Sequence, residues 1–184
     1  MYNYTYKVYL NNNHLLSRDY NNYYTNRWVS GNQYLLASKY KVKQTTFASS
    51  INFVVGNPTK VNSKVKVVLY KGNGQNKTLV AESNNYSIST SNIPTLTGIN
   101  PPSITLPLIS PIILYPDTEY WAGVRVLSGN DSVKIAVDYS TPLQNYNTIA
   151  YMDINSNQWN YWSNNQLYPS MIRLNLKDSS FINM

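Results

Sequence analysis

Cysteine is absent from this sequence, which excludes disulfide bonds and thiolate metal sites. No run of about 18 apolar residues occurs either, so we expect no membrane insertion. The opening stretch MYNYTYKVYLNNNH lacks the basic start and apolar segment of a secretory signal, and we expect none there. The 184 residues suffice for one domain with a sizeable core.

Histidine and acidic residues are scarce, which argues against an enzyme. His14 is the only histidine, and no G-x-S-x-G or glycine-rich phosphate loop occurs. A paired-carboxylate hydrolase needs two acids in one cleft. Most acids here fall in predicted turns, where carboxylates usually accept bonds from backbone N–H groups. We therefore expect no catalytic residues and no cofactor. The acids are Asp19, Glu82, Asp117, Glu119, Asp131, Asp138, Asp153 and Asp178.

Asparagine and tyrosine are abundant instead, with 27 and 18 residues. An AT-rich genome explains part of this bias, but lysine is not raised to match. Charged residues make up 12% of the chain, about half the usual share of globular proteins. Such an uncharged polar surface is typical of strand-rich extracellular or virion-exposed proteins. The net charge of +7 permits anionic partners. The absence of a dense Lys/Arg block makes nucleic acid an unexpected one.

Apolar and polar residues alternate with a period of two along most of the chain, which predicts half-buried β-strands. Turn sequences such as KGNG and YPDT separate them. We predict an all-β fold: a single jelly-roll or Greek-key β-sandwich of about nine or ten strands, with an irregular N-terminal segment. The alternating segments are YTYKVYL, SKYKVKQTTF, SKVKVVLY, EYWAGVRV, SVKIAVDY and MIRLNL.

Two segments depart from this alternation. Residues 11–35 are polar and aromatic without a clear period, so we divide the chain into two parts. Residues 1–35 would form an N-terminal strand plus an irregular arm or oligomer contact, and residues 36–184 the jelly roll. The proline-rich stretch after residue 89 predicts a long surface crossover over 92–102, followed by two short edge strands.

From residue 36 on, the order of motifs resembles that of jelly-roll β-sandwich modules in phage tail-fibre or virion proteins and in secreted bacterial proteins. In secreted proteins these modules are carbohydrate-binding or accessory domains. The resemblance covers roughly four-fifths of the chain and implies a non-catalytic binding or assembly module. The glycine usual in the PGT turn is Asp117 here, a tolerable turn residue. The matching segments are TTFASSINFVVGNP, VKVVLYKGNGQNKTLVAES, ITLPLISPIILYPDTEYWAGV, AYMDINSNQWNYW and MIRLNL.

The aromatic residues near the C-terminus are the main candidate ligand-binding site. Trp159, Asn160, Tyr161 and Trp162 follow a predicted turn, and Trp121 lies on another strand. Strand alternation places Trp159 and Tyr161 on one face and Trp162 on the other. The rings would form a stacking platform, with side-chain amides beside them, for a glycan or a neighbouring subunit. The alternative is that all these rings pack in the core.

Two other patterns invite a functional interpretation. DINSN, which begins at Asp153, fits the start of a calcium loop, but the glycine and the closing glutamate are missing. A plain hairpin turn is the favoured interpretation, so we predict no metal site. Lys39, Lys41 and Lys43 would form a basic stripe with Lys64 and Lys66 if those two strands paired. Edge protection and solubility are the favoured explanation for these lysines.

The polar surface, the sandwich pattern and the expected absence of a secretory signal together favour a viral structural or attachment protein, such as a capsid, spike or fibre component. It would be located in the virion as a homo-oligomer with other virion subunits, and would contact a host surface glycan. The alternative is a free carbohydrate-binding module of an extracellular protein. An enzyme is the third hypothesis.

Overall fold

The computed structural model describes residues 5–9, 13–17, 22–30, 34–95, 98–138, 149–161 and 169–177. In the first three ranges and at position 99 it describes the backbone alone. The strands are numbered β1 to β16, and a single short 3-10 helix, η1 (Thr90–Asn92), is the only helix in these ranges. The described part of the chain holds no helix with the length and apolar character needed to cross a membrane.

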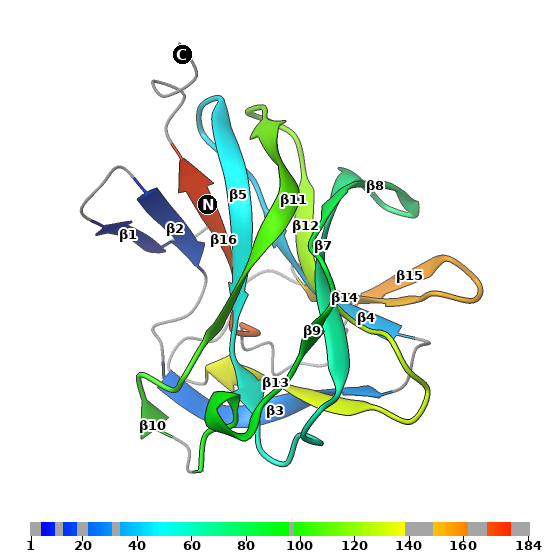
Figure 1. The fold of residues 1–184 in the computed structure, drawn as a ribbon. Coiled ribbons are helices and arrows are strands. Elements are labelled where there is room, and N and C mark those ends of the chain that lie inside the picture. The colour runs from blue at the N-terminus through cyan, green and yellow to red at the C-terminus, as the bar shows by residue number, and fades with distance from the viewer. Residues whose placement is uncertain are drawn as a thin grey trace.

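Two antiparallel sheets face each other (Figure 1). The five-strand sheet has the order β1-β2-β16-β5-β11. The seven-strand sheet has the order β15-β14-β4-β12-β7-β8, and β9 also pairs with β7. The strands of the first sheet are β1 (Thr5–Tyr9), β2 (Asn13–Ser17), β16 (Ile172–Lys177), β5 (Thr46–Phe53) and β11 (Ile104–Leu114). Those of the second are β15 (Gln158–Tyr161), β14 (Ile149–Asp153), β4 (Tyr34–Tyr40), β12 (Tyr120–Val126), β7 (Lys64–Asn73), β8 (Asn76–Glu82) and β9 (Tyr86–Ser87).

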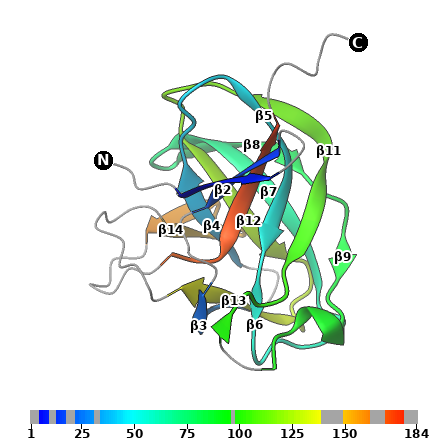
Figure 2. The same ribbon diagram turned by 90° about the vertical axis from the view of Figure 1, so that its left-hand side faces the viewer.

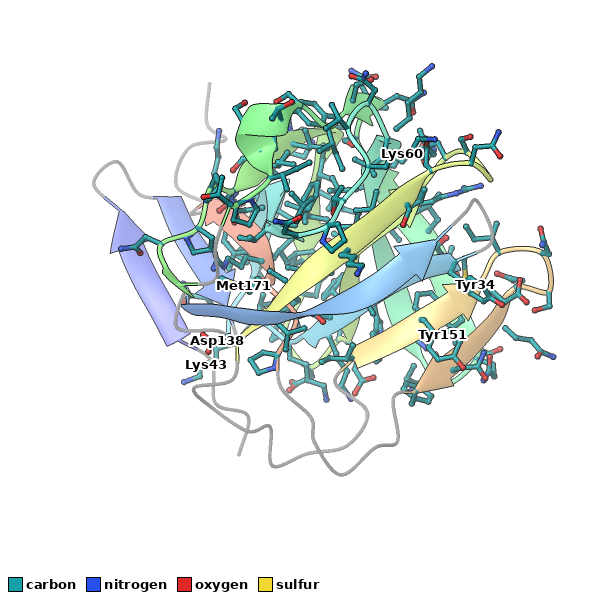
Figure 3. All side chains as sticks on the ribbon, turned by 90° about the horizontal axis from the view of Figure 1, so that it is seen from below. Tyr34, Lys43, Lys60, Asp138, Tyr151 and Met171 are labelled. Carbon is teal, nitrogen blue, oxygen red and sulfur yellow. The ribbon has the colours of Figure 1, made fainter. Side chains whose placement is uncertain are left out.

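A third sheet lies across the lower end of the sandwich in both ribbon views (Figures 1 and 2). Its order is β10-β3-β13-β6. Seen from below in Figure 3, β3 and β13 run side by side across the molecule, with Asp138 and Met171 near one end. The strands are β10 (Gly98–Ile99), β3 (Asn22–Ser30), β13 (Ser132–Asp138) and β6 (Val55–Gly56).

The main hydrophobic core fills the space between the two larger sheets. Alternate residues of β5, β7, β11, β12 and β16 contribute to it, because side chains alternate between the faces of a strand. On β12, for example, Tyr120, Ala122 and Val124 are at most 1% exposed and face this core. The same alternation buries Val65, Val67 and Leu69 of β7, and Ile172, Leu174 and Leu176 of β16. The predicted all-β sandwich is confirmed, with more strands than the nine or ten expected.

Within residues 11–35, the described ranges 13–17, 22–30 and 34–35 are strands, where an irregular segment was expected. The backbone forms β2, which pairs with β16, and β3, which pairs with β13 over most of its length. Strand formation here follows from partners that lie more than 100 residues away, and strand propensity depends strongly on such neighbours. The aperiodic local sequence therefore hid these strands. The division at residue 35 and the oligomer contact stay predictions.

The proline-rich segment also differs in detail. A single strand, β11, replaces the two short edge strands that were expected. It lies at the edge of the five-strand sheet, and its register against β5 shifts between Pro107 and Ile112. The prolines in this stretch, Pro107 and Pro111, cannot donate a backbone bond, and the strand continues past this break in the register.

The basic stripe that required strands β4 and β7 to pair does not form. β12 lies between β4 and β7, so the lysines of those two strands are not on paired neighbours. Lys39 instead lies 3.2 Å from Glu119, and Lys66 lies 2.6 Å from Glu82. These cations are balanced locally and give no continuous basic face.

Candidate functional site

A second apolar cluster covers the face of the seven-strand sheet that points away from the main core. We call it the outer cluster. Its buried members occupy strand positions that alternate with those facing the main core, and each is at most 8% exposed. The partly buried Ile154 and Tyr161 pack against it. The buried members are Leu35, Ala37, Val68, Tyr70, Trp121, Ala150, Met152 and Trp159.

The two ends of the seven-strand sheet meet over this cluster. The turn between β7 and β8 reaches β15, although β8 and β15 lie at opposite ends of the sheet order. The Gln75 side-chain amide donates to the Trp159 carbonyl (2.6 Å) and accepts from the Trp159 N–H (2.8 Å). The Tyr161 hydroxyl donates to the Gly74 carbonyl (2.9 Å). The sheet is thus curled, and its outer face is closed at this end.

The aromatic rings of the outer cluster contact each other directly. The Trp159 ring centroid lies 5.9 Å from that of Trp121 and 5.1 Å from that of Tyr70. The Tyr161 centroid lies 5.7 Å from that of Trp121. Tilted and edge-to-face pairs at these separations are favourable beyond the burial of their area. The four rings form a small second core.

Lys77 of β8 projects its ammonium into this group of rings. The Nζ atom lies 4.4 Å from the Trp159 ring centroid, 4.6 Å from that of Trp121 and 5.0 Å from that of Tyr161. It also donates to the Tyr161 hydroxyl (3.0 Å) and to the Gly74 carbonyl. Cations within about 6 Å of a ring face are attracted by its quadrupole. The lysine is 9% exposed.

Charged groups surround Lys77 on the neighbouring strands. Burial lowers the pKa of Lys77 to about 8, the Glu119 carboxylate raises it and Lys39 lowers it further. Glu119 also pairs with Lys39 (3.2 Å) and with Lys41 (3.7 Å). Burial raises the pKa of Tyr161, and Glu119 adds to that effect.

The structure brings three of the predicted site residues together. Trp121, Trp159 and Tyr161 share the outer face, and the predicted common face of Trp159 and Tyr161 is present. Trp121 and Trp159 are each 1% exposed, so their faces are covered by protein. Asn160 points to the other side of β15 and is exposed, and Trp162 lies outside the described residues. Whether any of them binds a ligand stays a prediction.

The DINSN segment forms the tight turn between β14 and β15. The Asp153 carboxylate accepts from the N–H groups of Asn155 (2.9 Å) and Ser156 (3.4 Å). Asn157 adopts the positive φ of 53° that such a turn requires. Within the described ranges, no three acidic or histidine side chains gather as metal ligands would.

The face of the five-strand sheet that points away from the main core carries a polar group that sequence analysis missed. Its residues alternate with core residues on β5, β11 and β16, and two register rows align them: Arg173, Asn52 and Thr105 in one, and Asn175 and Ser50 in the next. We call these five residues the polar face. Asn52 and Arg173 are 7% and 5% exposed, whereas Thr105 is exposed.

Hydrogen bonds hold the amides of the polar face in fixed orientations. Arg173 Nη1 donates to Asn52 Oδ1 (3.1 Å). The Asn52 amide then donates to the hydroxyls of Thr105 (2.8 Å) and Ser103 (3.0 Å). In the next row, Asn175 donates to the Ser50 hydroxyl (2.8 Å).

These bonds use one acceptor position of each hydroxyl. A hydroxyl has one O–H donor and two acceptor positions. Each of Ser50, Ser103 and Thr105 accepts from an amide, so its O–H group keeps its capacity to donate. Phe47 occupies the row beyond Ser50, where it is half-buried. The polar alternation in SSINF and MIRLNL was the available signal, but it looks like any solvated strand face.

Comparisons with known proteins identify the fold and no family. No family model matches the chain, and no curated protein matches it. Four chains of solved structures do, and two of them are chains of Cwp84. One is the clostridial cysteine protease Cwp84, in a variant form after propeptide cleavage, with a TM-score of 0.54 and 13% identity over 83% of this chain and 38% of that chain.

The other contains the cysteine protease and lectin-like domains of Cwp84, a surface layer associated protein of Clostridium difficile. Its TM-score is 0.54, at 12% identity over 84% of this chain and 36% of that chain. The chain thus spans less than two-fifths of the length of each structure. At such low identity the likeness concerns the fold alone. It agrees with the part of the resemblance that concerns β-sandwich modules of secreted bacterial proteins.

Proposed function

We propose that this chain is a non-enzymatic carbohydrate-binding module of an extracellular protein, and that it binds saccharide on the polar face. The two hydrogen-bonded rows of the polar face are the main support for this proposal. Saccharide hydroxyls need donors and acceptors in fixed positions, and hydroxyls already oriented by amides lose little freedom on binding. Phe47 adds a ring at the end of the rows, where a sugar ring can stack.

The fold supports this function over a virion role. The sequence alone favoured a viral structural protein, with the carbohydrate-binding module as the alternative. The structural likeness is to chains of a bacterial surface layer associated protein, one of which includes a lectin-like domain. Fold does not imply function, so the argument rests on the site.

The absence of cysteine bears on the enzyme hypothesis. One structural neighbour is a cysteine protease, but this chain has no cysteine and cannot supply a thiolate nucleophile. The match also covers only 38% of that protein's chain. A binding role is therefore the better proposal for this chain.

A glycan array probed with the 184-residue chain tests the proposal. We expect a specific set of saccharides to bind, and the Asn175→Ala and Thr105→Ala variants to lose at least about fivefold in affinity, since a bound hydroxyl left without partners costs about 1–3 kcal/mol. Asn160→Ala is the matched control, because it removes an exposed amide from β15. Isothermal titration with one array hit would give the affinities.

The outcomes separate the two candidate sites. Loss of binding in Asn160→Ala and Tyr161→Phe, with Asn175→Ala unchanged, would favour the aromatic site expected from the sequence. No binding to any saccharide by the folded chain would contradict the proposed function itself.

A further inference from the structure

The surroundings of Lys77 have the composition of an ammonium-binding site. Three rings lie within 5.0 Å of Nζ, and two oxygens, the Tyr161 hydroxyl and the Gly74 carbonyl, accept its hydrogens. The rings attract the positive charge of an ammonium, and the two oxygens accept hydrogen bonds from its N–H groups.

Bonds that do not involve Lys77 hold each wall of this site. Trp121 Nε1 donates to the Gly72 carbonyl (3.1 Å), which fixes its ring on β12. The backbone of Trp159 is held by Gln75, and Tyr161 is held by the Gly74 carbonyl (2.9 Å). The walls therefore persist when the lysine side chain is shortened.

We propose that Trp121, Trp159 and Tyr161, with the Gly74 carbonyl, form a binding site for a primary alkylammonium group, which the chain fills with its own Lys77. The bound ammonium joins the β7–β8 hairpin to β15, and so closes the outer face of the seven-strand sheet. This site lies on the opposite sheet from the polar face, and the inference does not depend on the proposed carbohydrate binding.

The rings and the two oxygens contact the amino group of Lys77 and offset part of the cost of burying its charge. An apolar residue would fill the same space without the cost of desolvating a cation. Burial does lower the pKa of Lys77 to about 8, but the ammonium stays the main form at neutral pH. The facing charged and titratable groups are Lys39 of β4, Lys41 just after β4, Glu119 just before β12, Tyr70 of β7 and Tyr161 of β15.

Chemical rescue of Lys77→Ala tests the inference. This variant removes Cγ, Cδ, Cε and Nζ, the atoms of a propylammonium, so n-propylammonium should raise its melting temperature in a saturable way. n-Propanol has a similar size without charge and should bind roughly 2- to 30-fold more weakly, the range expected for cation–π contacts. Tetramethylammonium cannot donate to Tyr161 or Gly74 and should also bind more weakly than n-propylammonium.

Lys71→Ala is the matched control. Its ammonium lies 6.0 Å from a single ring, that of the half-exposed Tyr115, so n-propylammonium should leave this variant unchanged. Equal rescue of Lys77→Ala by n-propanol and n-propylammonium would overturn the inference, as would an equal response of Lys71→Ala.

A measurement on the unmodified chain covers the case in which Lys77→Ala does not fold. Ring currents should shift the ε-methylene protons of Lys77 upfield of those of the other lysines in the proton NMR spectrum. If Lys77 has the same ε-methylene shift as the solvent-exposed lysines, the ammonium is not held among the rings and the inference fails.

Discussion

The side chain of Gln75 binds the backbone of Trp159 as a neighbouring β-strand would. Its amide accepts from the Trp159 N–H at 2.8 Å and donates to the Trp159 carbonyl at 2.6 Å. A side-chain amide has the same donor and acceptor groups as a peptide unit, so it can satisfy an exposed strand edge. This pair links a hairpin turn to a strand at the far end of the same sheet.

Replacing Gln75 with alanine should destabilise the fold by about 1–3 kcal/mol, the net contribution of two hydrogen bonds. The Trp159 backbone would lose both partners, and the hairpin would keep its contacts with β15 through Lys77, Tyr161 and the Tyr70 ring. Urea denaturation measures the change. Asn76→Ala, at an exposed neighbouring position, is the control and should stay within about 0.5 kcal/mol of the parent. Equal stabilities for the two variants would contradict a structural role for Gln75.

The stability of the fold should rise with pH between about 8 and 9.5. Lys77 has a pKa of about 8 in the folded chain and 10.5 when solvated, so the unfolded chain binds more protons in this range. The stabilisation that comes from neutral Lys77 is complete above pH 10.5, the pKa in the unfolded chain. It is lost as the pH falls through 8, the pKa in the folded chain. Urea midpoints at several pH values measure this effect.

Lys77→Met should flatten that pH dependence, because it removes the titrating amine and keeps an apolar stem. Burial raises the pKa values of Tyr70 and Tyr161, so ionisation of these phenols opposes folding at higher pH. The two chains should therefore be compared below pH 10, the ordinary pKa of tyrosine. A slope of the same size in Lys77→Met would show that another group is responsible.

Gly123 should not tolerate a larger residue. An added Cβ would lie 3.0 Å from the Leu36 carbonyl oxygen and 3.1 Å from the Ala37 side chain. Gly123→Val should therefore destabilise the chain by about 1–3 kcal/mol through overpacking, measured by denaturant unfolding. Gly74→Asn is the control, since no atom lies within 4 Å and asparagine tolerates its φ of 52°. An unchanged Gly123→Val variant would contradict close packing on this face.

Asp153 should act as a turn residue and not as a calcium ligand. Asp153→Ala should lose about 1 kcal/mol, because two backbone N–H groups lose their acceptor, whereas Asp153→Asn keeps an acceptor and should be close to neutral. Calcium should leave the melting temperature of the parent chain unchanged. A calcium-dependent rise that Asp153→Ala abolishes would restore the metal-site interpretation.

Local pattern was sufficient for the strands of the sandwich. The alternation along SKVKVVLY and EYWAGVRV predicted which residues of β7 and β12 face the core, and Val65, Val67, Tyr120 and Ala122 are buried there. It also predicted that Trp159 and Tyr161 share a face. These features depend only on the two-residue period of extended backbone.

Partners distant in sequence determined the remainder. β2 and β3 form against β16 and β13, and β12 separates the lysines of β4 from those of β7. The burial of Trp121 and Trp159 depends on the hairpin that brings Gln75 and Lys77 to β15. Periodicity assigns a side chain to a face of its strand. Whether that face meets solvent depends on how the whole sheet curls, because the covering residues come from other strands.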